Sequence, residues 1–478
     1  MKIPRLTALA LIPLLVNSCA WLAPDYQRPE MALPGAWFGV SGQPGGMTGA
    51  AWWKNYQDPA LDRLVDESLA HNGDLALAGA RLRQARATYD FAFANQFPLL
   101  SLGGNASRSR LSPFYTEQKT NLGALGGLLT YELDIWGRQA SAREATRSAM
   151  TATQFRQDAL RLSVSAATAQ LYFSLMALDA DIRITEETIR SREESYAIVR
   201  KQFEREAANG LVLRQSEAEM EGTRARLAQL LIERDKAETS LSVLLGRPPR
   251  EIIEGQIERG AEIAALPASP VMPDDLPSTL LERRPDIASA EAALIASNFK
   301  IGIARAAYFP QITLSSLLGI SSVDVQSVFN STMRTWQLGA SMAGPVLDFG
   351  RTSSGVDLAK EEFQELLEGY KNTIRTAFKE VRDALSEQVH TQSEEEARVR
   401  EEQALQEALR LANLRYAAGY SSYIEVLDAQ RSLYSAQIAL VAVKRARLNA
   451  SVNMHKALGG GWTEAEALRP ASEKLASR

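Results

Sequence analysis

The sequence predicts a mainly α-helical, internally duplicated chain that contributes four β-strands to a barrel closed only by several copies. Three observations predict this fold class. The chain has 478 residues, and its landmarks recur about 210 residues apart. Each half contains two alternating polar and apolar segments of roughly ten residues, the length of a tilted strand that crosses a bilayer. Each half then continues with about seventy residues of helical pattern, far longer than a globular helix.

The composition argues against several classes of protein. With 53 Lys+Arg against 57 Asp+Glu, a net charge of -4 and no basic block, a nucleic-acid partner is not expected. One Cys and three His leave little for a disulfide or a Cys/His metal site. The three His lie in helical, charged contexts without a hydrolase or zinc-protease motif, so no catalytic residue is expected. Past residue 19 we expect no membrane-spanning helix.

Residues 1–18 have the pattern of a signal peptide. Lys2 and Arg5 precede an apolar stretch from Leu6 to Val16 that is too short to span a bilayer. The stretch ends at Val16-Asn17-Ser18-Cys19, which resembles the bacterial lipobox. The resemblance implies that Cys19 carries a covalent diacylglycerol and an N-acyl lipid and begins a lipidated segment, 19–59. Ala20, in place of Asp, then implies delivery to the outer membrane. The alternative is a secreted protein with a buried Cys.

Four landmarks define the duplication. Phe97-Pro98 returns as Phe309-Pro310 at an offset of 212. The other three pairs lie 209 to 213 residues apart: Gly137 and Gly350, Gly210 and Gly419, Gly246 and Gly459. Because all four occur in one order and at nearly one spacing, we predict a repeated unit. The predicted divisions are repeat 1 at 60–246, an equatorial linker at 247–282, repeat 2 at 283–459 and a tail at 460–478.

Each repeat begins with one predicted helix, at about 60–94 and about 283–307. The helix ends at Phe-Pro because the residue before Pro leaves the helical region. Two strands follow in each repeat, at about 97–108 and 121–134, and again at about 309–321 and 334–347. Apolar positions such as Trp336 and Leu338 alternate with polar ones. The polar positions that we expect to line a barrel lumen are Gln311, Thr313, Gln337 and Ser341.

Long helical patterns follow the strands, after Gly137 and after Gly350. Seventy helical residues extend on the order of 100 Å. A return helix of about 35 residues then ends at Gly246 and at Gly459. The pattern predicts two coiled-coil hairpins with tips near 210 and 419, whose runs of Glu and Arg form solvated faces.

The strand count requires an oligomer. Four strands cannot close on themselves, and open edges are not tolerated in lipid. Two copies would give an eight-stranded barrel filled by side chains, whereas three would give twelve strands and a lumen. The polar inner positions favour twelve. Because the helical hairpins are too polar for lipid, we expect them to form a long periplasmic tube continuous with the barrel.

These residues together resemble the TolC-like outer-membrane factors, in the lipoprotein branch that serves resistance-nodulation-division (RND) tripartite efflux pumps. The resemblance covers almost the whole mature chain. Its motifs are Ala23-Pro24-Asp25-Tyr26-Gln27-Arg28-Pro29, Trp52-Trp53, Arg283-Arg284-Pro285-Asp286, Leu347-Asp348-Phe349-Gly350-Arg351, Leu427-Asp428-Ala429-Gln430-Arg431-Ser432-Leu433 and Leu458-Gly459-Gly460-Gly461-Trp462. It implies a lipid-anchored homotrimer in the cell outer membrane, with a twelve-stranded barrel and a long α-barrel. The implied function is the exit duct for small molecules, with a periplasmic adaptor protein and an inner-membrane RND transporter as partners.

The resemblance also implies a gate at the periplasmic helix tips. Ile424, Asp428 and Arg431 fall on one face of the last long helix. Three copies of Ile424 would make an apolar constriction, and three Asp428 a carboxylate ring. Arg431 would tie the tip to a neighbouring helix, and Tyr416 would bind a partner across the hairpin. The alternative is that Ile424 packs inside the chain while Asp428 and Arg431 form an ordinary exposed pair.

Several alternatives stay open. Gly210 and Gly419 suit a tip that an adaptor hairpin approaches, but they suit a free turn equally. Ser421-Ser422 could cap the helix that follows. Aromatic residues near the strand ends form either an interfacial girdle or loop packing: Phe114, Tyr115, Tyr308, Phe309, Phe329 and Trp336. Other functions compatible with the pattern are a non-conducting periplasmic coiled-coil lipoprotein and a type I secretion exit duct. The pump selects the substrate, so the sequence does not name it.

Overall fold

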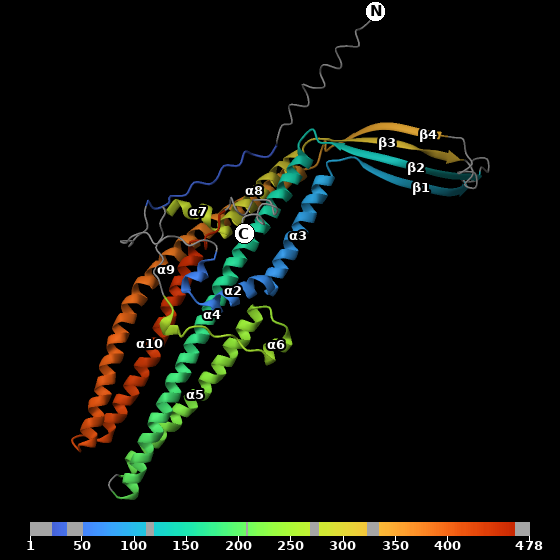
Figure 1. Ribbon diagram of the computed structural model, residues 1–478. Coiled ribbons are helices and arrows are strands. Elements are labelled where there is room, and N and C mark those ends of the chain that lie inside the picture. Colours follow the sequence, from blue (N-terminus) through green and yellow to red (C-terminus); the bar gives the residue numbers. More distant parts are fainter. Residues whose placement is uncertain are drawn as a thin grey trace, which may run out of the picture. The chain divides into compact units, whose positions relative to one another are not determined.

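The computed structural model describes residues 22–35, 51–110, 119–206, 209–267, 277–322 and 334–463. Contacts divide the chain into two compact units, which are described separately. The first comprises Met1–Met31, Ala80–Gln154 and Ser289–Asn372, and the second comprises Ala32–Gly79, Phe155–Ala288 and Thr373–Arg478. The described elements are η1 (Trp52–Tyr56), α2 (Pro59–His71), α3 (Gly73–Ala94), β1 (Leu99–Arg110), β2 (Lys119–Leu133), α4 (Arg138–Glu204), α5 (Gly210–Leu244), α6 (Pro249–Glu254), η2 (Ile263–Ala265), η3 (Pro277–Thr279), α7 (Leu280–Arg283), α8 (Pro285–Ala306), β3 (Gln311–Ser322), β4 (Arg334–Ala343), α9 (Arg351–Ala417) and α10 (Tyr423–Ala457) (Figure 1).

The two halves of the chain carry the same elements in the same order. The outgoing helices α4 and α9 have 67 residues each. The return helices α5 and α10 have 35 residues each. A single shift of 213 residues relates both pairs of helices from their first to their last residue. The duplication therefore extends to the length of every long helix.

The entry helix of the first repeat is broken, where the sequence pattern predicts one continuous helix, whereas α8 of the second repeat is continuous and lies within two residues of its predicted bounds. In the first repeat Asn72 separates α2 from α3. Its side-chain oxygen accepts from the backbone N–H groups of Asp74 and Leu75, and its Nδ2 donates to the carbonyl of Leu244 at 2.8 Å. Asn72 thus caps α3 and binds the end of α5, two tasks that a residue inside a helix could not perform.

In the second repeat Arg284 separates α7 from α8, 212 residues after Asn72. Pro285 begins α8, because proline has no backbone N–H to continue α7. Arg284 Nη1 donates to the carbonyl of Ala457, the last residue of α10, at 3.0 Å. Different side chains therefore anchor the return helix at the same place in both repeats.

The four strands form one antiparallel sheet in the order β1-β2-β3-β4. The register places Leu133 opposite Ile312 and Tyr131 opposite Leu314, so β2 and β3 join the two repeats. Three strands lie within two residues of their predicted bounds. The fourth ends at Ala343, four residues before the predicted end at 347.

The first unit also holds the start of the described chain. The segment from residue 22 to residue 30 lies along α8. Arg28 makes two hydrogen bonds to the carboxylate of Glu291, at 2.7 and 2.8 Å. Asn298 Nδ2 donates to the carbonyl of Pro24 at 2.6 Å, and Arg305 donates to that of Leu22 at 3.1 Å. Residues 22–30 are thereby fixed along the helix.

Among the described residues, α8 is the one helix long and apolar enough, by length and composition, to cross a membrane. The sequence pattern predicts no such helix. A little over half of the apolar window is buried inside the protein. Because the N-terminal segment also covers this helix, its apolar character matches a packed position in the fold.

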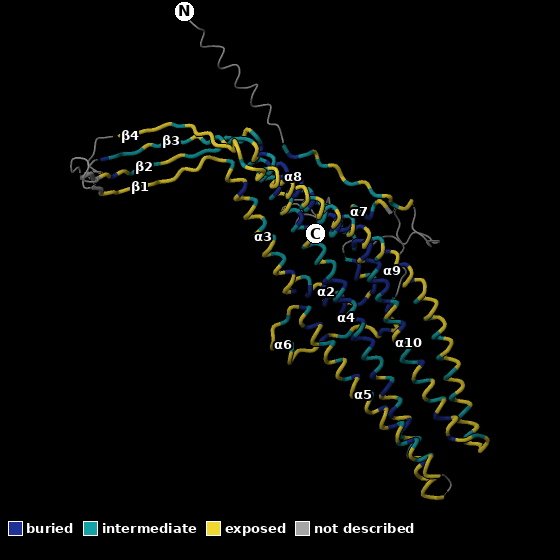
Figure 2. The backbone as a smooth tube through the Cα atoms, turned by 180° about the vertical axis from the view of Figure 1, so that it is seen from behind, coloured by how far each residue is buried: buried dark blue, intermediate teal, exposed yellow. Residues whose placement is uncertain are grey.

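The second unit has an aromatic core. Trp52 and Tyr56 are buried with Tyr172, Phe173 and residues of both return helices. The backbone around α2 includes dark-blue, buried stretches (Figure 2). Tyr172 donates to the buried carboxylate of Asp58 at 2.7 Å. His455, on α10, is also buried and stacks on Trp52 with ring centroids 5.2 Å apart. This core holds the hairpin bases together.

The hairpin tips differ from the predicted alignment. The predicted match of Gly210 with Gly419, at an offset of 209, is wrong. Gly210 is the first residue of α5 and corresponds to Tyr423 of α10. The residue that corresponds to Gly419 is Glu206, because both adopt left-handed backbone, with φ of 77° and 59°. A non-glycine residue occupies the turn position of the first tip.

The predicted capping by Ser421-Ser422 is also wrong. Ser422 stands at the N-cap of α10, but its side chain makes no capping hydrogen bond. The first tip is capped by Asn209, whose side-chain oxygen accepts from the backbone N–H of Val212 at 3.0 Å. Of the two return helices, α5 has a side-chain cap at its start and α10 has none.

Candidate functional site

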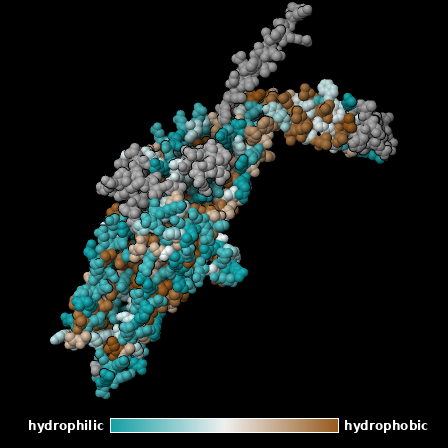
Figure 3. Space-filling view, in the orientation of Figure 1, coloured by the Kyte–Doolittle hydropathy of each residue, from teal (hydrophilic) through white to brown (hydrophobic). Residues whose placement is uncertain are grey.

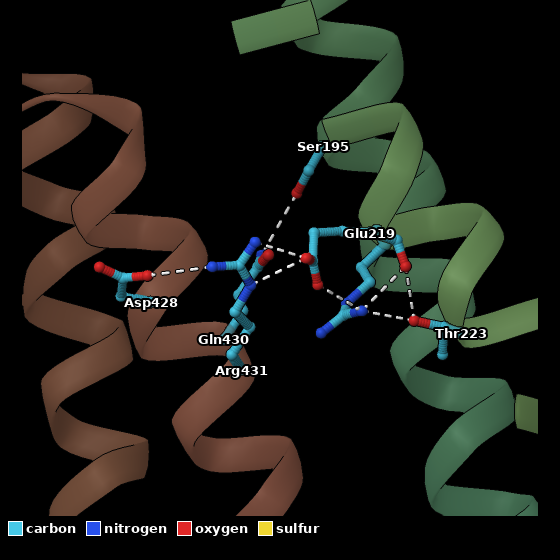
Figure 4. A network of polar contacts seen from close by, with 7 residues as sticks. Ser195, Glu219, Thr223, Asp428, Gln430 and Arg431 are labelled. Carbon is cyan, nitrogen blue, oxygen red and sulfur yellow. Dashed lines mark hydrogen bonds and ion pairs between the residues drawn. The ribbon is translucent and has the colours of Figure 1, made fainter. Parts of the chain in front are cut away.

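An ion pair crosses between the two hairpins near their tips. Arg431, on α10, donates from Nε and Nη2 to Oε1 of Glu219 on α5, at 2.8 and 2.5 Å (Figure 4). Arg431 is about half exposed, whereas Glu219 is largely covered. The hydrogen bond to Glu219 raises the pKa of Arg431, so Arg431 stays positively charged at physiological pH. The prediction that Arg431 binds a neighbouring helix agrees with this geometry.

Glu219 is held from its own hairpin as well. Arg192, on α4, lies 3.0 Å from Oε2 of Glu219 and donates to the Glu219 carbonyl at 2.9 Å. It also donates to the hydroxyl of Thr223, and its guanidinium lies 5.8 Å from the ring centre of Tyr434. Burial lowers the pKa of Arg192. The carboxylate of Glu219 therefore bridges two arginines, one from each hairpin.

A second polar contact crosses between the hairpins. The hydroxyl of Tyr416, on α9, donates to Oε1 of Gln202 on α4 at 2.8 Å. The ring of Tyr416 lies 5.3 Å from that of Tyr423. Tyr423 belongs to a small buried cluster with Val199, Val426 and Leu427. The tips of the two hairpins are therefore joined by a hydrogen bond and by packing of apolar side chains.

Ile424 and Asp428 are not enclosed within one chain. Ile424 is 39% exposed, and the Asp428 side chain is 65% exposed. Asp428 lies 3.3 Å from Arg431, which is the exposed pair of the alternative interpretation. Because Arg431 also binds Glu219, the pair belongs to a larger network. The constriction and the carboxylate ring stay predictions that need other copies of the chain.

The partners of the predicted gate residues were missed from sequence. Glu219 and Arg431 occupy nearly the same position in their helices, counted from the first residues Gly210 and Tyr423. Counting from the two helix starts would have placed these opposite charges at one height. Arg192 and Gln202 gave no such signal, because nothing in the pattern of α4 marks which of its faces meet α5 and α9.

Gly210 and Gly419 occupy different backbone positions at the two hairpin tips. Gly419 occupies the left-handed turn between α9 and α10. Gly210 lies at the start of a helix, with the ring of Phe203 as the nearest neighbour of the space where a Cβ would stand, at 3.7 Å. The structure therefore gives Gly419, but not Gly210, the backbone of a tight turn. Adaptor docking at either residue stays a prediction.

The register places all four predicted lumen residues on one face of the sheet. Thr313 lies opposite Ser341, and Gln337 lies on the same face opposite Leu317. Gln311 lies opposite Ala343 on that face too. The other face carries most of the large exposed apolar side chains of the sheet, namely Leu100, Leu102, Leu129, Leu314, Leu318, Trp336, Leu338 and Met342, whereas Leu99, Leu122 and Leu128 lie on the face of the predicted lumen residues. Apolar surface covers the strands in the space-filling view (Figure 3).

Some predicted sites are only partly described. Cys19, Phe114, Tyr115 and Phe329 lie outside the described residues. Trp136 covers Phe309, which favours loop packing for that ring, while Trp336 is exposed on the apolar face. Among the described residues, no group of three or more His, Cys, Asp or Glu side chains is placed to hold a metal ion.

Residues 64–247 and 276–460 each match the sequence model described as "Outer membrane efflux protein". The chain belongs to the outer membrane efflux protein family. The two matched ranges correspond to the two repeats.

Relatives of this family match nearly the whole chain. It is 35% identical to the probable efflux pump outer membrane protein TtgC of Pseudomonas putida KT2440, over 96% of each protein. It is 34% identical to the cation efflux system protein CusC of Escherichia coli strain CFT073, over 95% of this chain and 98% of that one. The crystal structure of the Campylobacter jejuni CmeC outer membrane channel matches with a TM-score of 0.88 and 26% identity, covering 96% of this chain and 98% of that one.

The membership settles the broad function. This outer membrane efflux protein is a channel component located in the outer membrane, with the fold of the TolC-like factors. Its family consists of transport components rather than enzymes. It is therefore an efflux channel and not a coiled-coil spacer of the periplasm.

Proposed function

We propose that three copies of this chain form the exit duct of a tripartite efflux pump and that the helix tips close it. The four strands of each copy would complete a twelve-stranded barrel, and the two hairpins of each copy would form the periplasmic tube. A periplasmic adaptor protein and an inner-membrane RND transporter would deliver small molecules to it. Diacylglycerol and an N-acyl chain on Cys19 would anchor each copy in the outer membrane.

The observation that carries the gate is the contact of Arg431 with Glu219. It joins α10 to α5, so it must break if the tip of one hairpin moves away from the other. Arg192 binds the same carboxylate from α4, within the hairpin that contains Glu219. Opening would therefore release Arg431 while Glu219 keeps a cationic partner, which avoids an uncompensated buried charge.

The geometry of the tips supports a role in the gate for the other predicted residues. The Tyr416 hydroxyl and Gln202 form the second bond that movement of the hairpin tip must break. Asp428 and Ile424 stay exposed in one chain, so three copies around an axis could bring both side chains to the pore. A ring of Asp428 carboxylates would favour cations, and a ring of Ile424 would restrict the closed pore.

Planar-bilayer conductance of the purified trimer tests the gate. Arg431→Ala removes the crossing ion pair but leaves Glu219 bound to Arg192. A partly exposed ion pair contributes about 0.2–1 kcal/mol, and three copies multiply this, so we expect the open fraction to rise several-fold. Arg410→Ala is the matched control, because Arg410 pairs with Glu407 on its own helix. Equal conductance of the two variants would contradict the gate, and a trimer without any conductance would contradict the duct.

The Asp428 ring has a separate test. Asp428→Asn keeps the shape of the side chain and removes its charge. We expect the reversal potential in a salt gradient to shift toward lower cation preference. Glu407→Gln, on the exposed face of α9, is the control for a loss of negative charge elsewhere. An unchanged reversal potential in Asp428→Asn would show that the carboxylates do not line the pore.

A further inference from the structure

The two repeats meet inside the chain along β2 and β3, and we call this boundary the internal seam. Its strands pair from Leu133 opposite Ile312 to Gly123 opposite Ser322. An aromatic stack closes one end of it. Trp136, just after β2, stacks on Phe309, just before β3, with ring centroids 4.5 Å apart and planes at 20°. The internal seam therefore consists of a strand ladder and an aromatic contact beside it.

The outer edges of the sheet expose the counterparts of these residues. In the described sheet, β1 and β4 each pair on one side only. Phe349, in the loop after β4, is 91% exposed, and Phe97, just before β1, is 57% exposed. Phe349 also has a left-handed backbone with φ of 54°, which is rare for an aromatic residue. Phe97 contacts the ring of Phe93 edge to face, with centroids 5.2 Å apart, yet both Phe97 and Phe349 keep most of their surface exposed beside an open strand edge.

The duplication relates these edges to the internal seam. The two β-hairpins share one register: Leu100 lies opposite Leu129, and Ile312 lies opposite Met342. Residues of β1 and β3 thus correspond at a shift of 212, and residues of β2 and β4 at 213. The same shifts carry Phe309 onto Phe97 and Trp136 onto Phe349. If β4 of one copy meets β1 of another, both strands and both aromatic rings repeat the internal seam.

We propose that β4 of one copy pairs antiparallel with β1 of the next, with Ala340 opposite Ala106, and that Phe349 of the first copy stacks on Phe97 of the second. The pairing follows from carrying the internal register, in which Gly127 lies opposite Leu318, across by the two shifts. This inference rests on the trimeric duct proposed above and deepens it by naming the contact through which the copies join.

The pattern of apolar positions supports this register. It brings Met342 opposite Gly104 and Val346 opposite Leu100, so the apolar face of β4 continues into the apolar face of β1. A slip of one residue would place Ala340 opposite Asn105 or Ser107, on the polar face. Since one face of the sheet contacts lipid, such a slip would be unfavourable along the whole strand.

The same register gives partners to residues beyond the end of β4. In one chain β4 stops at Ala343, although β1 starts at Leu99 and offers partners for four further residues. After Gly344 and Pro345, Val346 lies at a bend and Leu347 follows it, with 101% and 76% exposure. A second copy would pair Val346 with Leu100 on the apolar face, which removes Val346 from water, and Leu347 with Leu99 on the polar face.

The edge contact lacks one bond of the internal seam. Trp136 Nε1 donates to the carbonyl of Pro310 at 2.8 Å. Phe349 has no ring N–H with which to reach the matching carbonyl of Pro98. The contact between copies is therefore the weaker of two equivalent contacts, held by ring stacking and by strand pairing alone.

Disulfide cross-linking of the assembled protein tests the register. The variant carries Ala106→Cys with Ala340→Cys, and the control carries Asn105→Cys with Ala340→Cys. Within a chain, β1 and β4 are three strand spacings apart, roughly 14 Å, which is beyond disulfide reach. Oxidation should therefore link copies only, and we expect a covalent closed trimer as the main non-reduced species, at least about tenfold above the control. The single-substitution variants report any background from Cys19.

The outcomes separate this inference from the proposed duct. Preferred cross-linking in the Asn105→Cys control, or a conducting trimer without cross-links in either variant, would overturn the register and leave the duct intact. A protein that stays monomeric in detergent and conducts nothing would overturn both.

A double-mutant cycle tests the aromatic contact. We expect Phe349→Ala and Phe97→Ala each to lower the temperature at which the trimer dissociates, and the double variant to lower it no further than the larger single effect. Additive effects of the two substitutions would show that the rings do not touch.

Discussion

The charged side chains near the hairpin tips show how a single residue can join several helices. Glu219 binds Arg431 from the other hairpin and Arg192 from its own. The sequence pattern indicated Arg431 because it stands in a recognisable motif on a helix face. It did not indicate Glu219, because a Glu in a Glu-rich helix has no local mark. Which of many charged residues meet depends on how two helices face each other, and helix periodicity alone does not fix that.

His455 illustrates the same limit in the core. Its surroundings in the sequence are polar, yet the side chain is buried against Trp52. Burial lowers its pKa from 6.5 to about 4. Because the folded-state pKa is lowered, the stability that the neutral ring contributes is fully present above pH 6.5. It is lost as the pH falls towards 4.

We therefore expect the protein to become easier to unfold between pH 6.5 and pH 4. A His455→Gln variant should lose less stability over this range, by up to about 3 kcal/mol. Thermal unfolding in detergent at several pH values measures it. His390→Gln, which changes an exposed histidine on α9, is the matched control. If both variants follow the wild-type pH profile, protonation of His455 does not limit acid stability.

At the scale of elements, the repeat is more regular than its sequence landmarks suggest. The helix pairs have equal lengths and one shift, while the tip glycines gave a false offset. The error arose because Gly210 was taken as a turn residue, whereas Glu206 adopts the left-handed backbone. Strand positions were predictable from alternation. The break at Asn72 was not, because it depends on the carbonyl of Leu244 in a distant helix.

The junction of α5 with α2 makes an element-scale prediction. Gly246 has φ of 74°, and a Cβ there would stand 2.0 Å from the carbonyl oxygen of His71. We expect Gly246→Ala to destabilise the protein by more than about 1 kcal/mol. Gly222→Ala is the control, because Gly222 lies within α5 with open space around it. That change should stabilise the helix by about 0.5–1 kcal/mol. Thermal unfolding of both variants measures the two effects. Effects of the same sign would contradict the conclusion that the position of Gly246 requires glycine.

At the scale of the whole molecule, the proposed duct depends on the different polarity of the two faces of the sheet. Their alternation was visible in the sequence, because lipid and water select residues at a period of two. No single segment predicts the number of copies, because this number follows from the strand count and from closure of the barrel. The edges of the sheet are the least predictable part. Phe349 and Phe97 stand far apart in the chain and are understood only through the duplicate pair Trp136 and Phe309.

Two neighbouring residues of β4 test the assignment of the faces. Leu338→Lys places a charge on the apolar face, where it should destabilise the barrel by about 2–4 kcal/mol if the residue lies near the middle of the bilayer. Gln337→Lys places the same charge on the polar face, where we expect little loss of stability and a shift of selectivity toward anions. Trimer dissociation temperature and reversal potential measure the two effects. Equal destabilisation by both variants would show that the faces are wrongly assigned.

The equal lengths of the two hairpins set a rule for change in this protein. Both hairpins have outgoing helices of 67 residues and return helices of 35. A deletion of one heptad from each helix of only one hairpin would shorten that hairpin by roughly 10 Å. In a trimer, long and short hairpins would then alternate around the periplasmic end of the tube. A partner that binds all of the tips would lose contact with every second one. Deletions are therefore expected to be tolerated in matched pairs, one in each repeat, and to impair assembly with the pump when they occur singly.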